Sequence, residues 1–323
     1  MKKILAMLLA VMMLLSVASV AMAEGTTIAT DAFKKVYNLT NEGTTSPEET
    51  FRFTLTCTNV TDAREGIDET DAPALTATIG AMTAGNTENI SLSANKDFPS
   101  IGWYTYTITE TAGNTAGVTY DNTPRTLKVL VVNDDANGGL KIQSVAAVKN
   151  SDNTKDDTFT NVYSAGALSI EKQVTGNLGD KDKYFTVTVT LTGENGKTYA
   201  DSYAVTGGKY TAGETIKVGE PKTFELKNGD TITIANLPYG VTYTVVENDY
   251  TGNNGGYDAA TYTGDTGENA KIDGATQNVT ITNNKGGTID TGVMLDSMPY
   301  VLVLAVVGAA VIALIAKKRR VED

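Results

Sequence analysis

The chain has 323 residues, of which 38 are acidic and 26 basic, with no histidine and a single cysteine. The lack of histidine excludes His-dependent catalytic triads and His-ligated zinc or haem, and one cysteine excludes an intrachain disulfide framework. A net charge of −12 argues against nucleic acid as a partner, because its phosphates would repel the protein.

The N-terminus has the pattern of a secretory signal. Lys2 and Lys3 precede an apolar run over residues 4–20, and Ala21-Met22-Ala23 supplies the small residues of a signal peptidase site. We therefore expect residues 1–23 to be removed on export.

The middle of the chain predicts short antiparallel strands. Threonine alternates with Val, Ile, Tyr and Phe, and Asn-Gly turns interrupt the alternation at 137–138, 195–196 and 228–229. A convincing apolar stripe of helical period is missing between the two ends of the chain. The predicted fold is all-β, with two tandem Ig-like β-sandwich domains.

Two halves of this region repeat one another. The residues around Lys35 match those around Lys172, and the stretch that ends at Glu110 matches the one that ends at Glu247. The lysine and the glutamate are 75 residues apart in both halves.

A third match closes each half. Phe159-Thr160-Asn161 corresponds to Ile281-Thr282-Asn283, after a longer intervening segment in the first half. We accordingly place the first domain at residues 24–163 and the second at residues 164–287.

The repeated polar residues share a strand face with apolar residues, because positions i and i+2 of a strand point the same way. Lys35 alternates with Phe33 and Tyr37, and the glutamates and asparagines of the repeat alternate with Tyr, Phe, Ile and Val. Each domain is thus predicted to bury one lysine, one glutamate and one asparagine. A one-residue slip in register would exchange Lys35 for Lys34.

Buried groups of these three types favour an intramolecular isopeptide bond. Desolvation drives the lysine toward its nucleophilic neutral amine and the glutamate toward its protonated acid. We expect the acid to hydrogen-bond and polarise the asparagine side-chain carbonyl and to move protons, while the amine attacks and ammonia leaves. The alternative is a set of salt bridges with no covalent product.

The order of these strands resembles the major (backbone) pilins of Gram-positive sortase-assembled pili, in particular the two-domain streptococcal type. The resemblance implies one bond between Lys35 and Asn161, assisted by Glu110. It implies a second bond between Lys172 and Asn283, assisted by Glu247. Each reaction is a single-turnover self-modification, so the protein is not expected to be an enzyme.

Such pilins also present a lysine that accepts the neighbouring subunit. Lys155 lies six residues before Asn161, close to where the resemblance places that lysine, and Lys149 is the alternative.

The C-terminus resembles a Gram-positive sorting signal. Asp290-Thr291-Gly292 fits that signal, although Thr288 and Ile289 stand where Leu and Pro are usual. A sortase would cut between Thr291 and Gly292. The apolar run over residues 300–316 and the basic tail after it predict transient membrane anchoring, so residues 288–323 form the sorting segment.

The implied partners are sortase, other pilin subunits, accessory pilins and cell-wall peptidoglycan, and the implied location is the cell surface. A wall-anchored adhesin or accessory pilin that never polymerises is the alternative function. We expect no cofactor and no metal, because the Gly-, Asn- and Asp-rich segment 253–273 lacks the spacing of a calcium loop. Cys57 alternates with Phe53 and Leu55, which predicts a small buried core residue.

Overall fold

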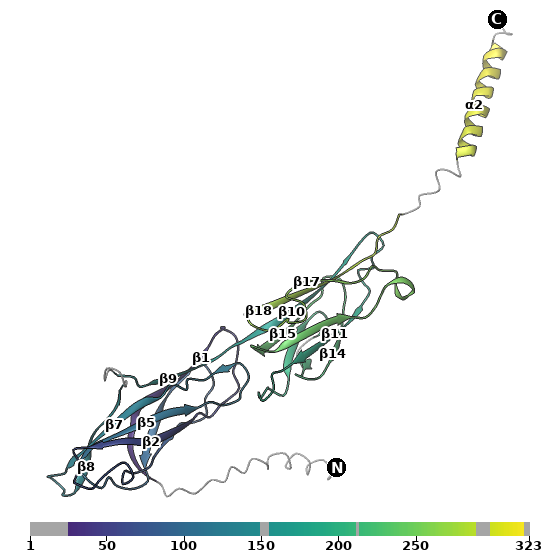
Figure 1. Ribbon diagram of the computed structural model, residues 1–323. Coiled ribbons are helices and arrows are strands. Elements are labelled where there is room, and N and C mark those ends of the chain that lie inside the picture. Colours follow the sequence, from purple (N-terminus) through teal and green to yellow (C-terminus); the bar gives the residue numbers. More distant parts are fainter. Residues whose placement is uncertain (1–24, 149–154, 211–212, 289–297, 320–323) are drawn as a thin grey trace, which may run out of the picture. The chain divides into compact units, whose positions relative to one another are not determined.

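The computed structural model describes residues 25–148, 155–210, 213–288 and 298–319 (Figure 1). The predicted signal peptide (1–23), Lys149, and the predicted sortase site at Thr291 and Gly292 lie outside these described residues. These assignments therefore stay predictions.

The first sandwich is built from two sheets that follow the predicted alternation. Its strands are β1 (Thr26–Leu39), β2 (Arg52–Thr61), β3 (Leu75–Thr78), β4 (Asn86–Ala94), β5 (Gly102–Thr111), β6 (Val118–Thr119), β7 (Arg125–Asn133), β8 (Leu140–Val148) and β9 (Thr158–Tyr163). One sheet has the order β3-β4-β1-β9-β6 and the other the order β2-β5-β7-β8. β1 and β9, the first and last strands in sequence, are parallel neighbours, whereas the other pairings of these sheets are antiparallel.

The core of the first sandwich lies between the inner faces of these sheets. In β5 every second residue from Gly102 to Glu110 is buried, as the period of two requires. Phe33, Ile90, Leu92 and Phe159 are fully buried in the same apolar cluster. Cys57 packs against this cluster but is only half-buried, so the predicted small core residue is less covered than expected. Its strand β2 keeps its alternating side chains only half-covered.

The second sandwich has the same all-β construction. Its strands are β10 (Ala165–Thr175), β11 (Phe185–Thr192), β12 (Tyr203–Gly207), β13 (Thr215–Ile216), β14 (Lys222–Leu226), β15 (Thr231–Pro238), β16 (Thr242–Glu247), β17 (Thr261–Gly264) and β18 (Thr276–Asn284), with a 3-10 turn η1 (Gly252–Asn254). The sheet orders are β13-β12-β15-β10-β18-β17 and β14-β11-β16. Here too the first and last of the described strands, β10 and β18, are neighbours.

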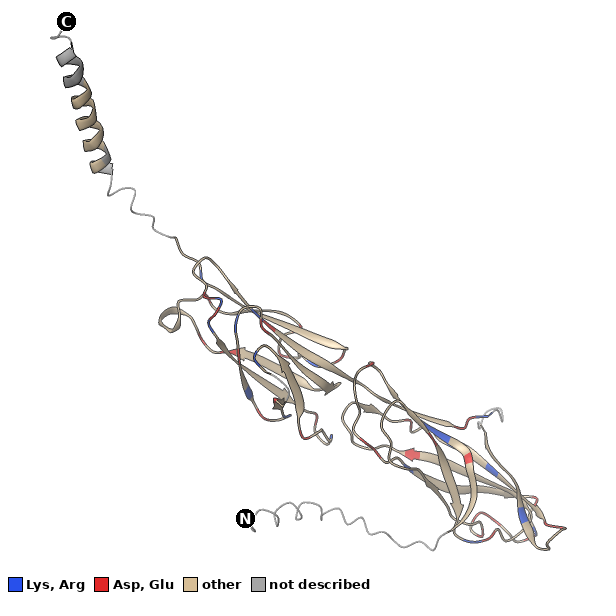
Figure 2. Ribbon diagram, turned by 180° about the vertical axis from the view of Figure 1, so that it is seen from behind, with Lys and Arg blue, Asp and Glu red and all other residues tan. Residues whose placement is uncertain are grey.

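Asn228-Gly229 is a turn, as predicted, and Gly229 has a φ of +83° that favours glycine. The turn links β14 to β15, which belong to different sheets, so it carries the chain across the sandwich rather than closing a hairpin. In Figure 2 charged residues fall mostly in loops and turns, although several strands also contain a blue or red band. Among the described residues, the buried charged ones are Lys35, Glu110, Arg125, Lys172 and Glu247.

By compactness the chain separates into two units that do not coincide with the two pairs of sheets. The smaller unit gathers Val174–Lys181, Asp249–Ala260 and the chain from Thr282 onward. The larger unit holds the rest of both sandwiches. The domain boundary expected at residues 163 and 164 stays a prediction.

The helix α2 (Met298–Arg319) occupies the C-terminal segment, and the side chains of residues 302–312 are exposed. Among the described residues, none of the helices combines the length and the apolar character needed to cross a membrane.

The stability of the first sandwich depends on its apolar core, so we expect Leu92→Ala to lower the free energy of unfolding by about 2–5 kcal/mol. Leu92 is fully buried on β4. Leu140→Ala is the matched control, because Leu140 is 40% exposed and its truncation leaves no internal cavity. Chemical denaturation of both variants measures the difference. Equal destabilisation by the two substitutions would contradict this assignment of the core.

Candidate functional site

The strand β1 directs a lysine side chain into the first core. Lys34 is exposed, whereas Lys35 has no exposed surface and lies between the buried Phe33 and Tyr37 on the same face. The choice between Lys34 and Lys35 that the sequence left open is thus settled geometrically in favour of Lys35 as the buried residue.

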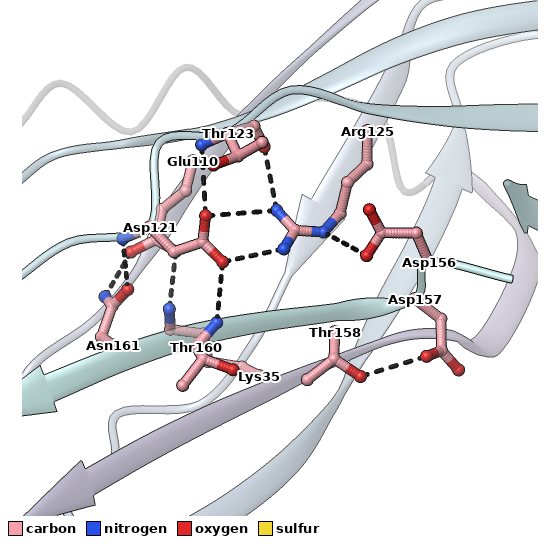
Figure 3. Close-up of polar contacts among 10 residues, drawn as sticks. All are labelled: Lys35, Glu110, Asp121, Thr123, Arg125, Asp156, Asp157, Thr158, Thr160 and Asn161. Carbon is pink, nitrogen blue, oxygen red and sulfur yellow. Dashed lines mark hydrogen bonds and ion pairs between the residues drawn. The ribbon is translucent and has the colours of Figure 1, made fainter. Parts of the chain in front are cut away.

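Glu110 and Asn161 meet this lysine from two other strands. The Lys35 Nζ lies 2.6 Å from Glu110 Oε2, and Asn161 Nδ2 donates to Glu110 Oε1 at 2.5 Å (Figure 3). In the parallel pairing of β1 with β9, Asn161 is aligned with Tyr37, two residues along from Lys35. Glu110 is 2% exposed and Asn161 is fully buried. The three residues predicted from the sequence therefore lie together in the first core.

The surroundings of the lysine are apolar. Its Nζ lies 4.5 Å from the centre of the Phe51 ring. Burial lowers the pKa of Lys35 and raises the pKa of Glu110, while the contact between the two groups opposes both changes. Burial therefore favours the neutral amine and the protonated acid, the forms that nucleophilic attack and proton transfer require.

The asparagine carbonyl has a partner that the sequence did not predict. The backbone N–H of Asp121 donates to Asn161 Oδ1 at 2.7 Å. The expectation that Glu110 would hydrogen-bond this carbonyl is wrong for the structure, since Glu110 accepts from the amide nitrogen instead. Asp121 lies in the loop between β6 and β7, where no strand alternation marks the residues that face the core.

The second sandwich repeats the buried lysine and glutamate. Lys172 has no exposed surface, Glu247 is 8% exposed, and the Lys172 Nζ lies 3.5 Å from Glu247 Oε1. The same amine donates to the carbonyl oxygens of Gln173 and Ile281, at 2.9 and 3.3 Å. Burial lowers the pKa of Lys172, and Glu247 opposes that change.

Further features match the first site. The Lys172 Nζ lies 4.4 Å from the centre of the Phe185 ring, as the amine of Lys35 lies over Phe51. Asn283 is 1% exposed and occupies β18, two residues beyond Ile281, whose carbonyl oxygen accepts from Lys172. The second lysine, glutamate and asparagine are therefore buried as the sequence predicts.

Comparisons with known proteins agree with this arrangement. Residues 31–164 match the family model of the Spy0128-like isopeptide containing domain, and residues 166–285 match a domain of unknown function, DUF7601. A pilin of Streptococcus pyogenes serotype M1 is 28% identical over 243 residues, which are 66% of this chain and 67% of that protein. The pilus tip adhesin Cpa of Streptococcus pyogenes is 32% identical over 80 residues, only 11% of its length.

The first sandwich is thus similar to the Spy0128-like isopeptide domain, and about two thirds of the chain is similar to a streptococcal pilin. Solved structures agree on the fold: the major pilin T3.2 of Streptococcus pyogenes has a TM-score of 0.53 at 23% identity, covering 80% of this chain and 99% of that one. Another Streptococcus pyogenes major pilin has a TM-score of 0.54 at 22% identity, covering 82% and 99%.

The candidate intersubunit lysine of this chain lies outside both cores. The Lys155 side chain is 74% exposed, and its Nζ lies 2.7 Å from Asp157 Oδ2. The hydrogen bond with Asp157 raises the pKa of Lys155. Unlike Lys35, this amine is accessible but held in its protonated form, so its reaction would need a separate base.

The buried lysine of the first sandwich is expected to make the free energy of unfolding depend on pH. In Glu110→Ala, Lys35 loses its carboxylate partner and keeps Asp121, Arg125 and Glu49 as charged neighbours. Since burial lowers the pKa of Lys35 and Glu110 no longer opposes this, the folded variant is expected to release the Lys35 proton below the ordinary lysine pKa of 10.5. Between these two pKa values the unfolded state binds more protons, so stability rises with pH, by up to about 1.4 kcal/mol per pH unit.

Denaturant unfolding at a series of pH values from neutral upward measures this slope. The control is Lys35→Met in the Glu110→Ala chain, which removes the titrating group and is expected to abolish the slope. A slope that persists in the double variant would assign the pH dependence to another residue.

Proposed function

We propose that this chain is the backbone subunit of a covalently polymerised pilus, and that each sandwich forms its own isopeptide bond. The supporting observation is the buried contact of Lys35, Glu110 and Asn161, together with the repetition of the same three residue types in the second sandwich. In the first sandwich, Lys35 and Asn161 would be joined with the help of Glu110. In the second, Lys172 and Asn283 would be joined with the help of Glu247.

The energetic reason for the reaction is the burial of charge. A lysine and a glutamate without exposed surface cost several kcal/mol of desolvation that their attraction repays only in part. The product is an uncharged amide, which removes the buried ammonium group. The fixed core supplies the proximity that an enzyme otherwise provides, since both reacting groups already contact one carboxyl group.

The proposed bonds also suit a load-bearing chain. Each would connect the first strand of its sandwich to the last described strand, closing a loop of more than a hundred residues. A cross-link over such a loop stabilises the fold by about 4–5 kcal/mol through the unfolded state. An amide is moreover insensitive to reducing agents, in a chain that has one cysteine.

Polymerisation requires a second chemistry, between subunits. We propose that a sortase cleaves between Thr291 and Gly292 and joins the Thr291 carbonyl to the Lys155 amine of the next subunit. The apolar segment and basic tail that follow would hold the precursor at the membrane until then. The final subunit and any accessory pilins would be linked to the cell-wall peptidoglycan by the same reaction. A non-polymerising adhesin is less well supported, because the match to Cpa covers 11% of that protein.

Intact-mass spectrometry tests the internal bonds directly. The mature chain is expected to weigh less than its sequence by two molecules of ammonia. Glu110→Ala and Glu247→Ala are each expected to restore one, because each removes the proton carrier of one sandwich. Tryptic mapping should recover the Lys35–Asn161 and Lys172–Asn283 cross-linked peptides. A mass equal to that of the unmodified sequence would rule out self-cross-linking.

Polymerisation is tested in cells that express the chain together with its sortase. We expect a ladder of multimers that resists boiling in detergent, and we expect Lys155→Arg to collapse it while leaving both internal bonds intact. Lys141→Arg is a control of the same chemistry on another partly exposed lysine of the first sandwich. A ladder that survives Lys155→Arg would transfer the role to a different lysine.

A further inference from the structure

The Asn161 side-chain carbonyl is held by a backbone donor. The N–H of Asp121 lies 2.7 Å from Asn161 Oδ1, while Asn161 Nδ2 faces Glu110 at 2.5 Å. An N–H group can only donate, so this contact fixes which end of the amide is oxygen. The electrophilic carbon therefore lies between a donor on its oxygen and a carboxyl group on its nitrogen (Figure 3).

The Asp121 side chain anchors the loop that carries this donor. Its carboxylate accepts from the backbone N–H of Thr160 at 3.0 Å, next to Asn161 in β9, and from that of Thr123 at 3.2 Å. It also receives two hydrogen bonds from the Arg125 guanidinium, at 2.8 and 3.4 Å. The loop is thus tied both to β9 and to β7.

Arg125 is itself fixed from three sides. Its Nε donates to Asp156 at 3.1 Å, and its Nη1 donates to the Thr123 carbonyl at 2.9 Å. The guanidinium lies 4.1 Å from the centre of the Phe159 ring and is 8% exposed. A planar guanidinium with this many contacts has little freedom to move, so it fixes the position of Asp121.

We propose that the Asp121 backbone N–H is the oxyanion donor of the reaction in the first sandwich, and that the Asp121 carboxylate and Arg125 are positioning residues that hold it in place. This inference rests on the isopeptide bond proposed above. It gives the loop between β6 and β7 a role in the reaction, in addition to the roles of Lys35, Glu110 and Asn161.

The donor acts at the step in which negative charge develops on oxygen. The neutral Lys35 amine attacks Asn161 Cγ, a C–N bond forms, and the carbonyl π electron pair moves onto Oδ1, facing the Asp121 N–H. Glu110 takes a proton from Nζ and gives one to Nδ2. The Cγ–Nδ2 bond then breaks, ammonia leaves, and the carbonyl re-forms as the new amide.

A fixed donor at this place stabilises the transition state more than the starting amide, because the oxygen becomes an anion only there. Arg125 has a second effect, on charge. The Asp121 carboxylate raises the pKa of Lys35 and Arg125 lowers it, so the arginine opposes the effect of the carboxylate on the amine.

The test is the rate at which each bond forms in the newly made full chain. The chain is synthesised in a cell-free system with detergent, samples are quenched in acidic denaturant, and the Lys35–Asn161 and Lys172–Asn283 peptides are quantified over time. The second bond is the internal control for synthesis and handling. Asp121→Ala is expected to slow the first bond by about 10- to 100-fold and to leave the second unchanged.

Two further variants separate positioning from general destabilisation. Asp121→Asn keeps one carbonyl oxygen for the backbone N–H groups, so its rate should lie between those of Asp121→Ala and the unchanged chain. Asp134→Ala is the matched control: Asp134 orders the β7–β8 turn by accepting from Ala136 N–H and Asn137 Nδ2 and lies 3.7 Å from Lys141. It should not change either rate.

Amide hydrogen exchange supplies a signature that loss of stability alone does not produce. In the unreactive Glu110→Ala chain the N–H of residue 121 should be protected. Adding Asp121→Ala should remove this protection selectively, while the amides of β5 and β7 keep theirs. Uniform loss of protection across the sandwich would overturn the positioning role.

The outcomes separate this inference from the proposed function. If the unchanged chain never forms the Lys35–Asn161 peptide, the proposed function fails. If that peptide forms and the Asp121 variants form it at the same rate, only the oxyanion assignment fails. Should Asp121→Ala prevent folding of the first sandwich, the comparison of Asp121→Asn with the unchanged chain decides, and equal rates overturn the assignment.

Discussion

The burial of a lysine amine against a glutamate is the constraint on which the first sandwich depends. Lys35 and Glu110 come from opposite sheets and have almost no exposed surface, so neither can be solvated if the other is absent. An ion pair in such a place returns only part of its desolvation cost. The surrounding features follow from that cost: an aromatic ring beneath the amine, an amide against the carboxyl group, and an Asp121–Arg125 ion pair whose two charges act on the amine in opposite directions. Formation of an amide bond would remove the cost rather than balance it.

The second sandwich meets the same constraint with different details. Phe185 takes the place of Phe51 beneath the amine, and the distances to the ring centres are nearly equal, 4.4 Å against 4.5 Å. The lysine–glutamate contact is longer, 3.5 Å against 2.6 Å, and the Lys172 amine also donates to two backbone carbonyls. The two halves match different family models. Both sandwiches therefore share a buried lysine amine that lies over an aromatic ring and beside a glutamate carboxyl group. The other contacts of the amine differ between the two cores.

Features that depend on local geometry could be predicted from the sequence, and features that depend on tertiary contacts could not. Strand alternation is local, so the order of residues alone identifies the buried faces that contain Lys35, Glu110 and Asn161. It cannot give the parallel pairing of β1 with β9, because pairing partners lie far apart in the chain. The role of Asp121 could not be predicted for the same reason. Asp121 lies in a loop, and its backbone N–H reaches the Asn161 side-chain amide only once β7 and β9 are in place. The orientation of the Asn161 amide, and hence the side from which Glu110 meets it, depends on that unforeseen donor.

The pairing of β1 with β9 explains why the bond would matter to a filament under tension. Load that enters at the start of β1 and leaves at the end of β9 shears two parallel neighbours, and hydrogen bonds alone would have to resist it. Lys35 is aligned with Phe159 and Asn161 with Tyr37, so a bond between Lys35 and Asn161 would cross the two strands diagonally within their paired region. The force would then pass from residue 35 to residue 161 through covalent bonds, and residues 36–160 would lie outside the load path. The β-sandwich would serve to bring the reacting groups together and shield them from water, while the cross-link itself would bear the tension.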